Sequence, residues 1–210
     1  MSPHIALLGD SILDNRAYTG GEPDVLEHLR SILPPPWRAT LLAIDGSITA
    51  DLDRQISRAP RDASHVVISI GGNDALMNRD LLSAPVRSTT EALALFADRL
   101  SVFRRSYSLA VDRALKLEKP TTVCTIYEGN LEPEEARIAR VALMTFNDVI
   151  LRAAFARRLP VIDLRFICTE AADYANPIEP SGPGGRKIAE AIARACGAIE
   201  RPSGVPVHVP

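Results

Sequence analysis

Apolar residues occur along this chain in two patterns: short unbroken runs, and longer segments with an apolar residue every three or four positions. The runs have the length of buried strands and cover residues 5–8, 39–44, 65–70, 121–126 and 160–164. The segments between them predict helices over residues 22–33, 47–58, 88–118, 132–158 and 185–195. Strands that alternate with helices are typical of a parallel sheet covered on both faces.

This alternation predicts an α/β fold, a three-layer α/β/α sandwich around a five-stranded parallel sheet. Right-handed crossovers favour the flavodoxin-like strand order 2-1-3-4-5 and place a pocket between the first and third strands. We expect one domain over residues 1–200 and an irregular tail over 201–210, where proline and glycine are frequent.

The first three predicted strands are each followed by glycine and short polar residues. Ser11 follows the first strand, Gly46 the second and Asn73 the third. Since the carboxyl ends of parallel strands meet at one edge of a sheet, we expect these residues on one rim. There Ser11 is a candidate nucleophile, while the Gly46 N–H and the Asn73 amide are candidate donors to an oxyanion. Asp10 and Asp74 flank the site and are candidate substrate-binding residues, although ordinary turn chemistry also explains such segments.

These three strand exits resemble the first three sequence blocks of the SGNH/GDSL hydrolase family. The matching segments are Gly9-Asp10-Ser11, Asp45-Gly46-Ser47 and Gly71-Gly72-Asn73-Asp74. The fourth block of that family is an Asp-x-x-His followed by Pro-Ser and a helix that begins with glycine. Residues 178–189 match its frame, but Glu179 stands in the place of the histidine and Asn176 in the place of the aspartate.

The resemblance implies an ester hydrolase that works through an acyl-Ser11 intermediate on a small substrate. Gly46, Asn73 and the Ser11 N–H would form the oxyanion hole, and no cofactor is expected. Without the histidine, Glu179 is the candidate base and Asn176 the residue that donates its amide N–H to orient it. The alternative is a pseudoenzyme or small-molecule binding protein that keeps the pocket without the chemistry.

A glutamate is a poorer base than histidine unless its pKa rises. The free side chains have pKa values of about 4.3 and about 6.5, so burial of Glu179 must close a gap of roughly two units. An aspartate at position 176 would repel the carboxylate, whereas asparagine would not. Alternatively, Asn176 and Glu179 belong to an ordinary Asx-type loop that does no chemistry.

Composition supports a globular protein that acts on a small molecule. The chain has 210 residues, 46% of them hydrophobic, 24% charged, and a net charge of −2. This balance offers no basic footprint for nucleic acid and no polybasic patch for a membrane. The beginning of the sequence lacks the features of a signal peptide, so we expect a cytoplasmic protein.

Two further features concern metals and self-association. The carboxylates of Asp10, Asp74 and Glu179 are hard oxygen ligands, but adjacent side chains tend to point apart, so we expect no metal site. In the 88–118 helix the apolar residues continue for nearly four heptads, which fits either a long core helix or a homodimer seam. The 132–158 helix is expected to pack on the sheet along its apolar face.

Overall fold

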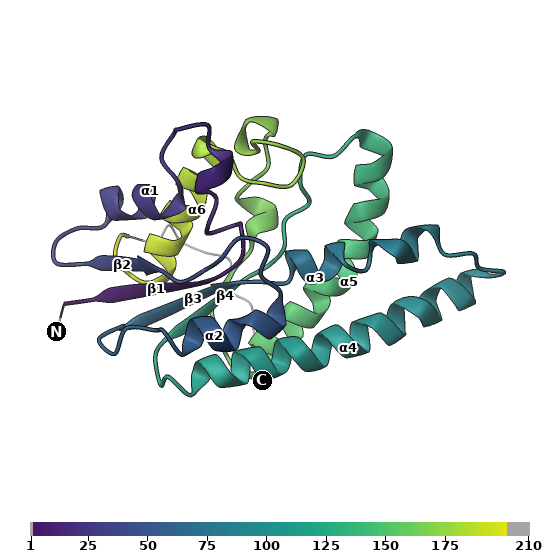
Figure 1. The fold of residues 1–210 in the computed structure, drawn as a ribbon, viewed down its shortest axis with the longest axis horizontal. Coiled ribbons are helices and arrows are strands. Elements are labelled where there is room, and N and C mark those ends of the chain that lie inside the picture. The colour runs from purple at the N-terminus through teal and green to yellow at the C-terminus, as the bar shows by residue number, and fades with distance from the viewer. Residues whose placement is uncertain (1, 201–210) are drawn as a thin grey trace.

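The computed structural model describes residues 2–200, so the expected tail over 201–210 lies outside the described residues. Its centre is a parallel five-stranded sheet in the order β2-β1-β3-β4-β5, which confirms the expected topology (Figure 1). The strands are β1 (His4–Gly9), β2 (Arg38–Leu41), β3 (His65–Ser69), β4 (Thr121–Cys124) and β5 (Val161–Ile162).

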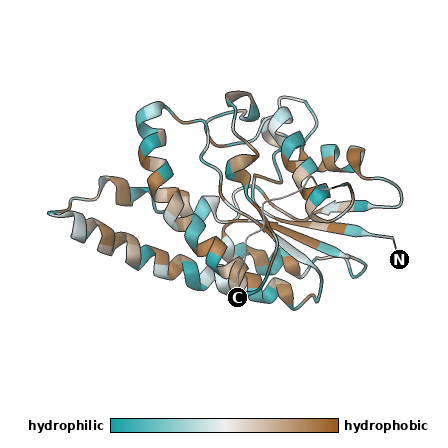
Figure 2. Cartoon of the chain, turned by 180° about the vertical axis from the view of Figure 1, so that it is seen from behind, coloured by the Kyte–Doolittle hydropathy of each residue, from teal (hydrophilic) through white to brown (hydrophobic). Residues whose placement is uncertain are grey.

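The side chains of β1 alternate between two apolar cores because successive residues of a strand point to opposite faces. Ile5 and Leu7 belong to one core, together with the buried faces of α1 (Val25–Ile32) and α6 (Gly182–Ala195). The residues between and after them, Ala6 and Leu8, belong to the other core. That second core is covered by α2 (Leu52–Ile56), α4 (Thr89–Leu115) and α5 (Pro133–Ala156). The molecule therefore has the expected three layers, and Figure 2 shows the apolar strands between them.

Local sequence signals account for the ends of several helices. Asp24 caps α1 through a capping box with Glu27, and Ser181 caps α6 by accepting a hydrogen bond from the Gly184 N–H. The expected 47–58 helix is shorter in the structure: a 3-10 turn over Thr49–Asp51 leads into α2. A second short helix, α3 (Gly72–Leu76), follows β3 directly.

The two long helices extend beyond the carboxyl edge of the sheet. In α4 the buried residues are all in the second half, from Phe103 onward, whereas Leu93 is 64% exposed. In α5, Ile138 and Val141 are exposed and burial begins at Phe146. The expectations of a continuous core seam in 88–118 and of sheet packing along all of 132–158 are therefore wrong for the first half of each helix, because the sheet is too short to cover them (Figure 1).

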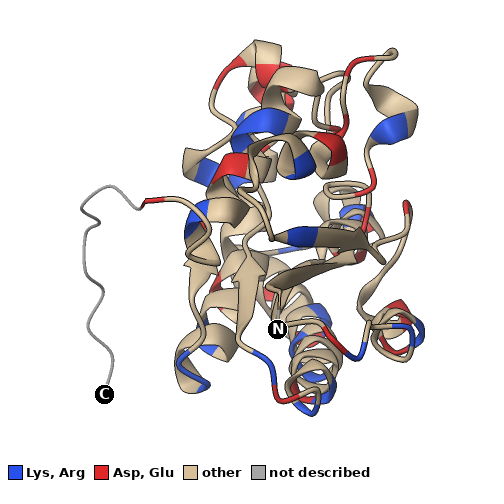
Figure 3. Cartoon of the chain, turned by 90° about the vertical axis from the view of Figure 1, so that its left-hand side faces the viewer, with Lys and Arg blue, Asp and Glu red and all other residues tan. Residues whose placement is uncertain are grey.

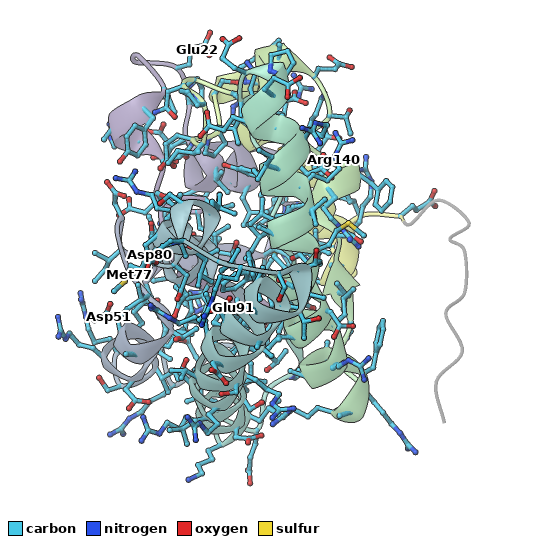
Figure 4. All side chains as sticks on the ribbon, turned by 90° about the vertical axis from the view of Figure 1, so that its right-hand side faces the viewer. Glu22, Asp51, Met77, Asp80, Glu91 and Arg140 are labelled. Atoms are coloured by element: carbon cyan, nitrogen blue, oxygen red, sulfur yellow. The ribbon has the colours of Figure 1, made fainter. Side chains whose placement is uncertain are left out.

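The projecting ends of these helices carry both charged and apolar side chains. Figure 4 looks onto them and labels Glu91 in the first turn of α4 and Arg140 in the first half of α5. Figure 3 shows basic and acidic positions interspersed over the opposite end of the molecule. None of the helices within residues 2–200 has the length and apolar character that a membrane span requires.

Candidate active site

A tight turn after β1 places Ser11 at the carboxyl edge of the sheet. Gly9 has a φ of +145°, and a Cβ at this position would collide with the carbonyl oxygen of Ser69 on the adjacent strand β3. The Asp10 carbonyl then accepts hydrogen bonds from the N–H groups of Leu13 and Asp14, each at 3.1 Å. This turn leaves the Ser11 side chain 6% exposed.

Glu179 lies beside this serine although the two residues are far apart in sequence. The Ser11 hydroxyl donates a hydrogen bond of 3.1 Å to Oε1 of Glu179. Glu179 is 7% exposed, and burial raises its pKa from 4.5 to about 6, against the opposing effect of the Ser11 hydrogen bond. A nearby carboxylate, Asp45, raises this pKa further by charge repulsion. The pKa is thus within about half a unit of a free histidine.

Asn176 acts on the loop backbone rather than on the carboxylate. Its Oδ1 accepts hydrogen bonds of 2.9 Å from the N–H groups of both Ile178 and Glu179, which is an Asx turn. The expected donation from the Asn176 amide to the Glu179 carboxylate is not among the described hydrogen bonds. That expectation is wrong because the asparagine is exposed and its oxygen faces the loop's own N–H groups.

Gly46 lies at the tip of the turn after β2 with a φ of +78° and no atom within 4 Å of where a Cβ would stand. Within residues 2–200, neither the Gly46 N–H nor the Ser11 N–H donates a hydrogen bond. The turn is tied to the serine loop because the Asp45 N–H donates to Asp14 at 3.0 Å and the Tyr18 hydroxyl donates to Asp45 at 2.7 Å. Two backbone donors are therefore free on neighbouring loops.

Asn73, near the start of α3, is bonded to the loop that carries Gly46. Its Nδ2 donates to the Ser47 carbonyl at 3.0 Å, which uses one of the two amide hydrogens and leaves the other. Its neighbour Asp74 accepts hydrogen bonds from the N–H and the hydroxyl of Thr49 at 3.0 and 2.7 Å. Both carboxylate oxygens of Asp74 are thus engaged within the protein. The expected substrate-binding role of Asp74 is replaced by support of the Gly46 turn.

Asp10 is also turned into the protein and not toward a ligand. It is 2% exposed, its Oδ1 accepts a hydrogen bond from the Ile12 N–H, and its Oδ2 faces Gly72 at the start of α3. Burial raises its pKa to about 8, and the charges of Glu179 and Asp74 add to this effect. The expected role in substrate binding does not fit this burial, and the side chain lies between the serine loop and α3.

Gln55 supports the site but carried no motif in the sequence. This buried residue of α2 accepts a hydrogen bond from the Gly9 N–H at 2.7 Å and donates to the Gly9 carbonyl at 2.8 Å. It also donates to the Ser47 hydroxyl at 3.2 Å, so it joins the end of β1 to the Gly46 turn. The one available signal was a glutamine between the apolar residues Leu52 and Ile56 in a short helix.

Within residues 2–200, no histidine forms a hydrogen bond with Ser11 or Glu179. His4 contacts Asp62 and Thr40, and His65 lies against Trp37, so both have structural surroundings. His208 lies outside the described residues. No group of three or more potential ligands in the described part of the chain is arranged to hold a metal ion.

A small cavity of about 180 Å³ opens beside the candidate oxyanion donor. It is lined by Ile44, Asp45, Gly46, Ser47, Asp51 and Arg54. The Gly46 turn is therefore accessible from solvent at this cavity, whose lining does not include Ser11, Asn73 or Glu179.

Comparison with known proteins places the chain in a family and shows which solved structures share its fold. Residues 7–185 match the model of a family described as GDSL-like Lipase/Acylhydrolase. No curated protein matches the chain in sequence. Similar solved structures include a phospholipase A1 from Streptomyces albidoflavus, with 14% identity and a TM-score of 0.70 over 93% of this chain and 100% of that one.

Two further solved structures extend the comparison. An α/β hydrolase from the metagenome of Lake Arreo is 19% identical, with a TM-score of 0.68 over 96% of this chain and 99% of that one. An acetylxylan esterase from Geobacillus stearothermophilus, solved as a catalytic mutant in which alanine replaces a histidine, is 17% identical, with a TM-score of 0.68 over 94% of this chain and 96% of that one. At these identities the likeness shows a shared fold.

Proposed function

The chain belongs to the GDSL-like lipase/acylhydrolase family, and we propose that it is a serine ester hydrolase in which Glu179 replaces the histidine base. The observation that carries the proposal is the hydrogen bond of 3.1 Å from the Ser11 hydroxyl to a buried carboxylate whose pKa is raised to about 6. A base with this pKa is ionised at neutral pH and accepts a proton far better than a free glutamate.

In the proposed reaction, Ser11 Oγ attacks the ester carbonyl carbon while its proton passes to Oε1 of Glu179. The N–H groups of Gly46 and Ser11, with the remaining amide hydrogen of Asn73, stabilise the resulting oxyanion. When the intermediate collapses, the C–O bond to the alcohol breaks and Glu179 returns the proton to the leaving oxygen. Glu179 then takes a proton from a water molecule as the water oxygen attacks the acyl carbon. The bond between that carbon and Ser11 Oγ breaks, the proton passes from Glu179 to Oγ, and the acid is released.

The choice of a first substrate rests on a structural neighbour and not on the cavity beside Gly46. Of the proposed catalytic and oxyanion residues only Gly46 lines it, so the cavity of about 180 Å³ does not set the length of the acyl group. The Geobacillus relative is named for acetylxylan, an acetyl ester. We therefore propose short-chain esters, with acetyl esters as the first to test.

The test is hydrolysis of p-nitrophenyl acetate by the wild type, Ser11→Ala and Asn73→Ala. Ser11→Ala should reduce turnover to background, and Asn73→Ala should lower kcat by roughly 10²–10³ through loss of an oxyanion donor. A fluorophosphonate probe should label Ser11 in the wild type alone. Equal rates for the wild type and Ser11→Ala, with no labelling, would instead favour the pseudoenzyme reading, in which the pocket binds a ligand without turnover.

A further inference from the structure

The carboxylate of Glu179 depends on a loop that is attached to the rest of the site at a few points. Within the loop, the Ala175 N–H donates to the Glu179 carbonyl at 2.9 Å, and Asn176 closes its Asx turn. These contacts shape the loop but do not fix its position relative to Ser11. The position must come from contacts with other elements.

One such contact comes from Asn15, which belongs to the same loop as Ser11 and is fully buried. Its Nδ2 donates to the carbonyl of Pro180, the residue after Glu179, at 3.1 Å. Its Oδ1 accepts a hydrogen bond from the Val25 N–H at 3.0 Å. Because an N–H can only donate and a carbonyl can only accept, these two partners fix which end of the amide faces the Glu179 loop.

The second contact comes from Tyr127, which follows β4 and is 4% exposed. Its hydroxyl donates to the carbonyl of Ile178, the residue before Glu179, at 2.5 Å. Its ring packs edge-on against Tyr174 with the ring centres 5.2 Å apart, which limits its movement. The backbone adds a third attachment, from the Asn130 N–H to the Pro177 carbonyl at 2.8 Å.

We propose that Asn15 and Tyr127 are positioning residues that hold the two carbonyls flanking Glu179 and so aim its carboxylate at the Ser11 hydroxyl. This inference deepens the proposed function and rests on it for its effect on rate. Neither side chain touches the reacting atoms. Each acts through the peptide groups on one side of Glu179.

Tyr174 offers a matched control for Tyr127. Its hydroxyl also donates to a backbone carbonyl, that of Cys168 at 2.8 Å, and its ring belongs to the same aromatic pair. Tyr127→Phe and Tyr174→Phe therefore each remove one hydroxyl-to-carbonyl bond and no packing. Only the first bond lies next to Glu179.

Tyr127→Phe should lower kcat while KM stays unchanged, since a catalytic group displaced by about 1 Å costs roughly 10²-fold. The loosened loop admits water to the carboxylate, and because burial is the largest cause of the raised pKa, its loss outweighs the loss of the Ser11 hydrogen bond. The pKa of Glu179 therefore falls from about 6 toward 4.5, and the acid limb of kcat/KM moves to lower pH. Tyr174→Phe should change neither quantity. Asn15→Ser should lower kcat and shift the acid limb in the same direction as Tyr127→Phe. If Asn15→Ser does not fold, the comparison of Tyr127→Phe with Tyr174→Phe tests the proposal.

A second measurement does not depend on activity. The titration of Glu179 is followed by ¹³C NMR of labelled glutamate carboxyls, with Glu179→Gln used to assign the signal. A lower midpoint in Tyr127→Phe than in Tyr174→Phe supports positioning, and equal midpoints and equal rates in both variants overturn it. A wild type without esterase activity would count against the proposed function, while the NMR comparison would still judge the role of Tyr127.

Discussion

Glu179 should set the acid limb of the pH–rate profile. With a pKa of about 6, the base is ionised above pH 7 and kcat/KM should be constant there. Below pH 6 the rate should fall tenfold for each pH unit, so at pH 5 it should be about one tenth of the plateau. The assay is p-nitrophenyl acetate hydrolysis from pH 4.5 to 8, read at the isosbestic wavelength of the released nitrophenol.

Replacing Glu179 should lower the hydrolysis rate and abolish the acid limb of the pH–rate profile. Glu179→Gln keeps the shape of the side chain and can still accept a hydrogen bond from Ser11, but it cannot take a proton. General-base catalysis contributes typically 10²–10⁴-fold, so kcat should fall within that range. Undiminished turnover in Glu179→Gln would refute the assignment, and a limb centred near pH 8 would point to Asp10, whose pKa is raised to about 8.

The same profile tests the physical cause of the shift. The carboxylate of Asp45 raises the pKa of Glu179 because it repels the ionised form. Asp45→Asn should therefore lower the midpoint of the acid limb, and the difference should shrink at high salt. Asp51, which lines the same cavity, is not among the groups that raise this pKa, so Asp51→Asn is the control and should leave the midpoint in place. Equal midpoints in all three proteins would contradict the electrostatic account.

Three further predictions concern the support of the site. The stability of Asp10→Asn relative to the wild type should rise as pH rises from about 4 to about 8. The reason is that the folded wild type keeps the proton of Asp10 until about 8, whereas the unfolded chain releases it near 3.8. The difference in unfolding free energy should grow by up to about 1.4 kcal/mol per pH unit. Thermal melts at both ends of this window check it, and a constant Tm difference would contradict it. Asp74→Ala leaves the Thr49 N–H without its acceptor, while the Thr49 hydroxyl keeps Ser106 as its remaining partner. Stability in urea should therefore fall by about 2 kcal/mol, and kcat should fall with it. An unchanged kcat would mean that the Gly46 turn does not need this support. In Gly184→Ala the new Cβ would collide with the Asp173 carbonyl oxygen, which should lower both Tm and kcat, and an unaltered melt would show that the backbone yields freely there.

The sequence determined the sheet and the place of Ser11. Apolar runs of strand length, separated by helical segments, are sufficient for a parallel sheet, because each strand must be buried on both faces. The glycine at the end of the first apolar run, followed by short polar residues, then indicates a tight turn at the end of this strand. Ser11 at the carboxyl edge follows from these two facts alone.

The contacts of the site were decided by tertiary structure. In the sequence, Glu179 stands where the resembling family has a histidine. Only the folded chain brings its carboxylate to Ser11 and buries it enough to raise its pKa. In the folded chain, Asn176 bonds to the backbone of its own loop. Asn15 and Tyr127 instead hold that loop through the carbonyls of Pro180 and Ile178. Hydrogen-bond partners far apart in sequence leave no local pattern, because their geometry exists only after the strands, turns and loops have packed together.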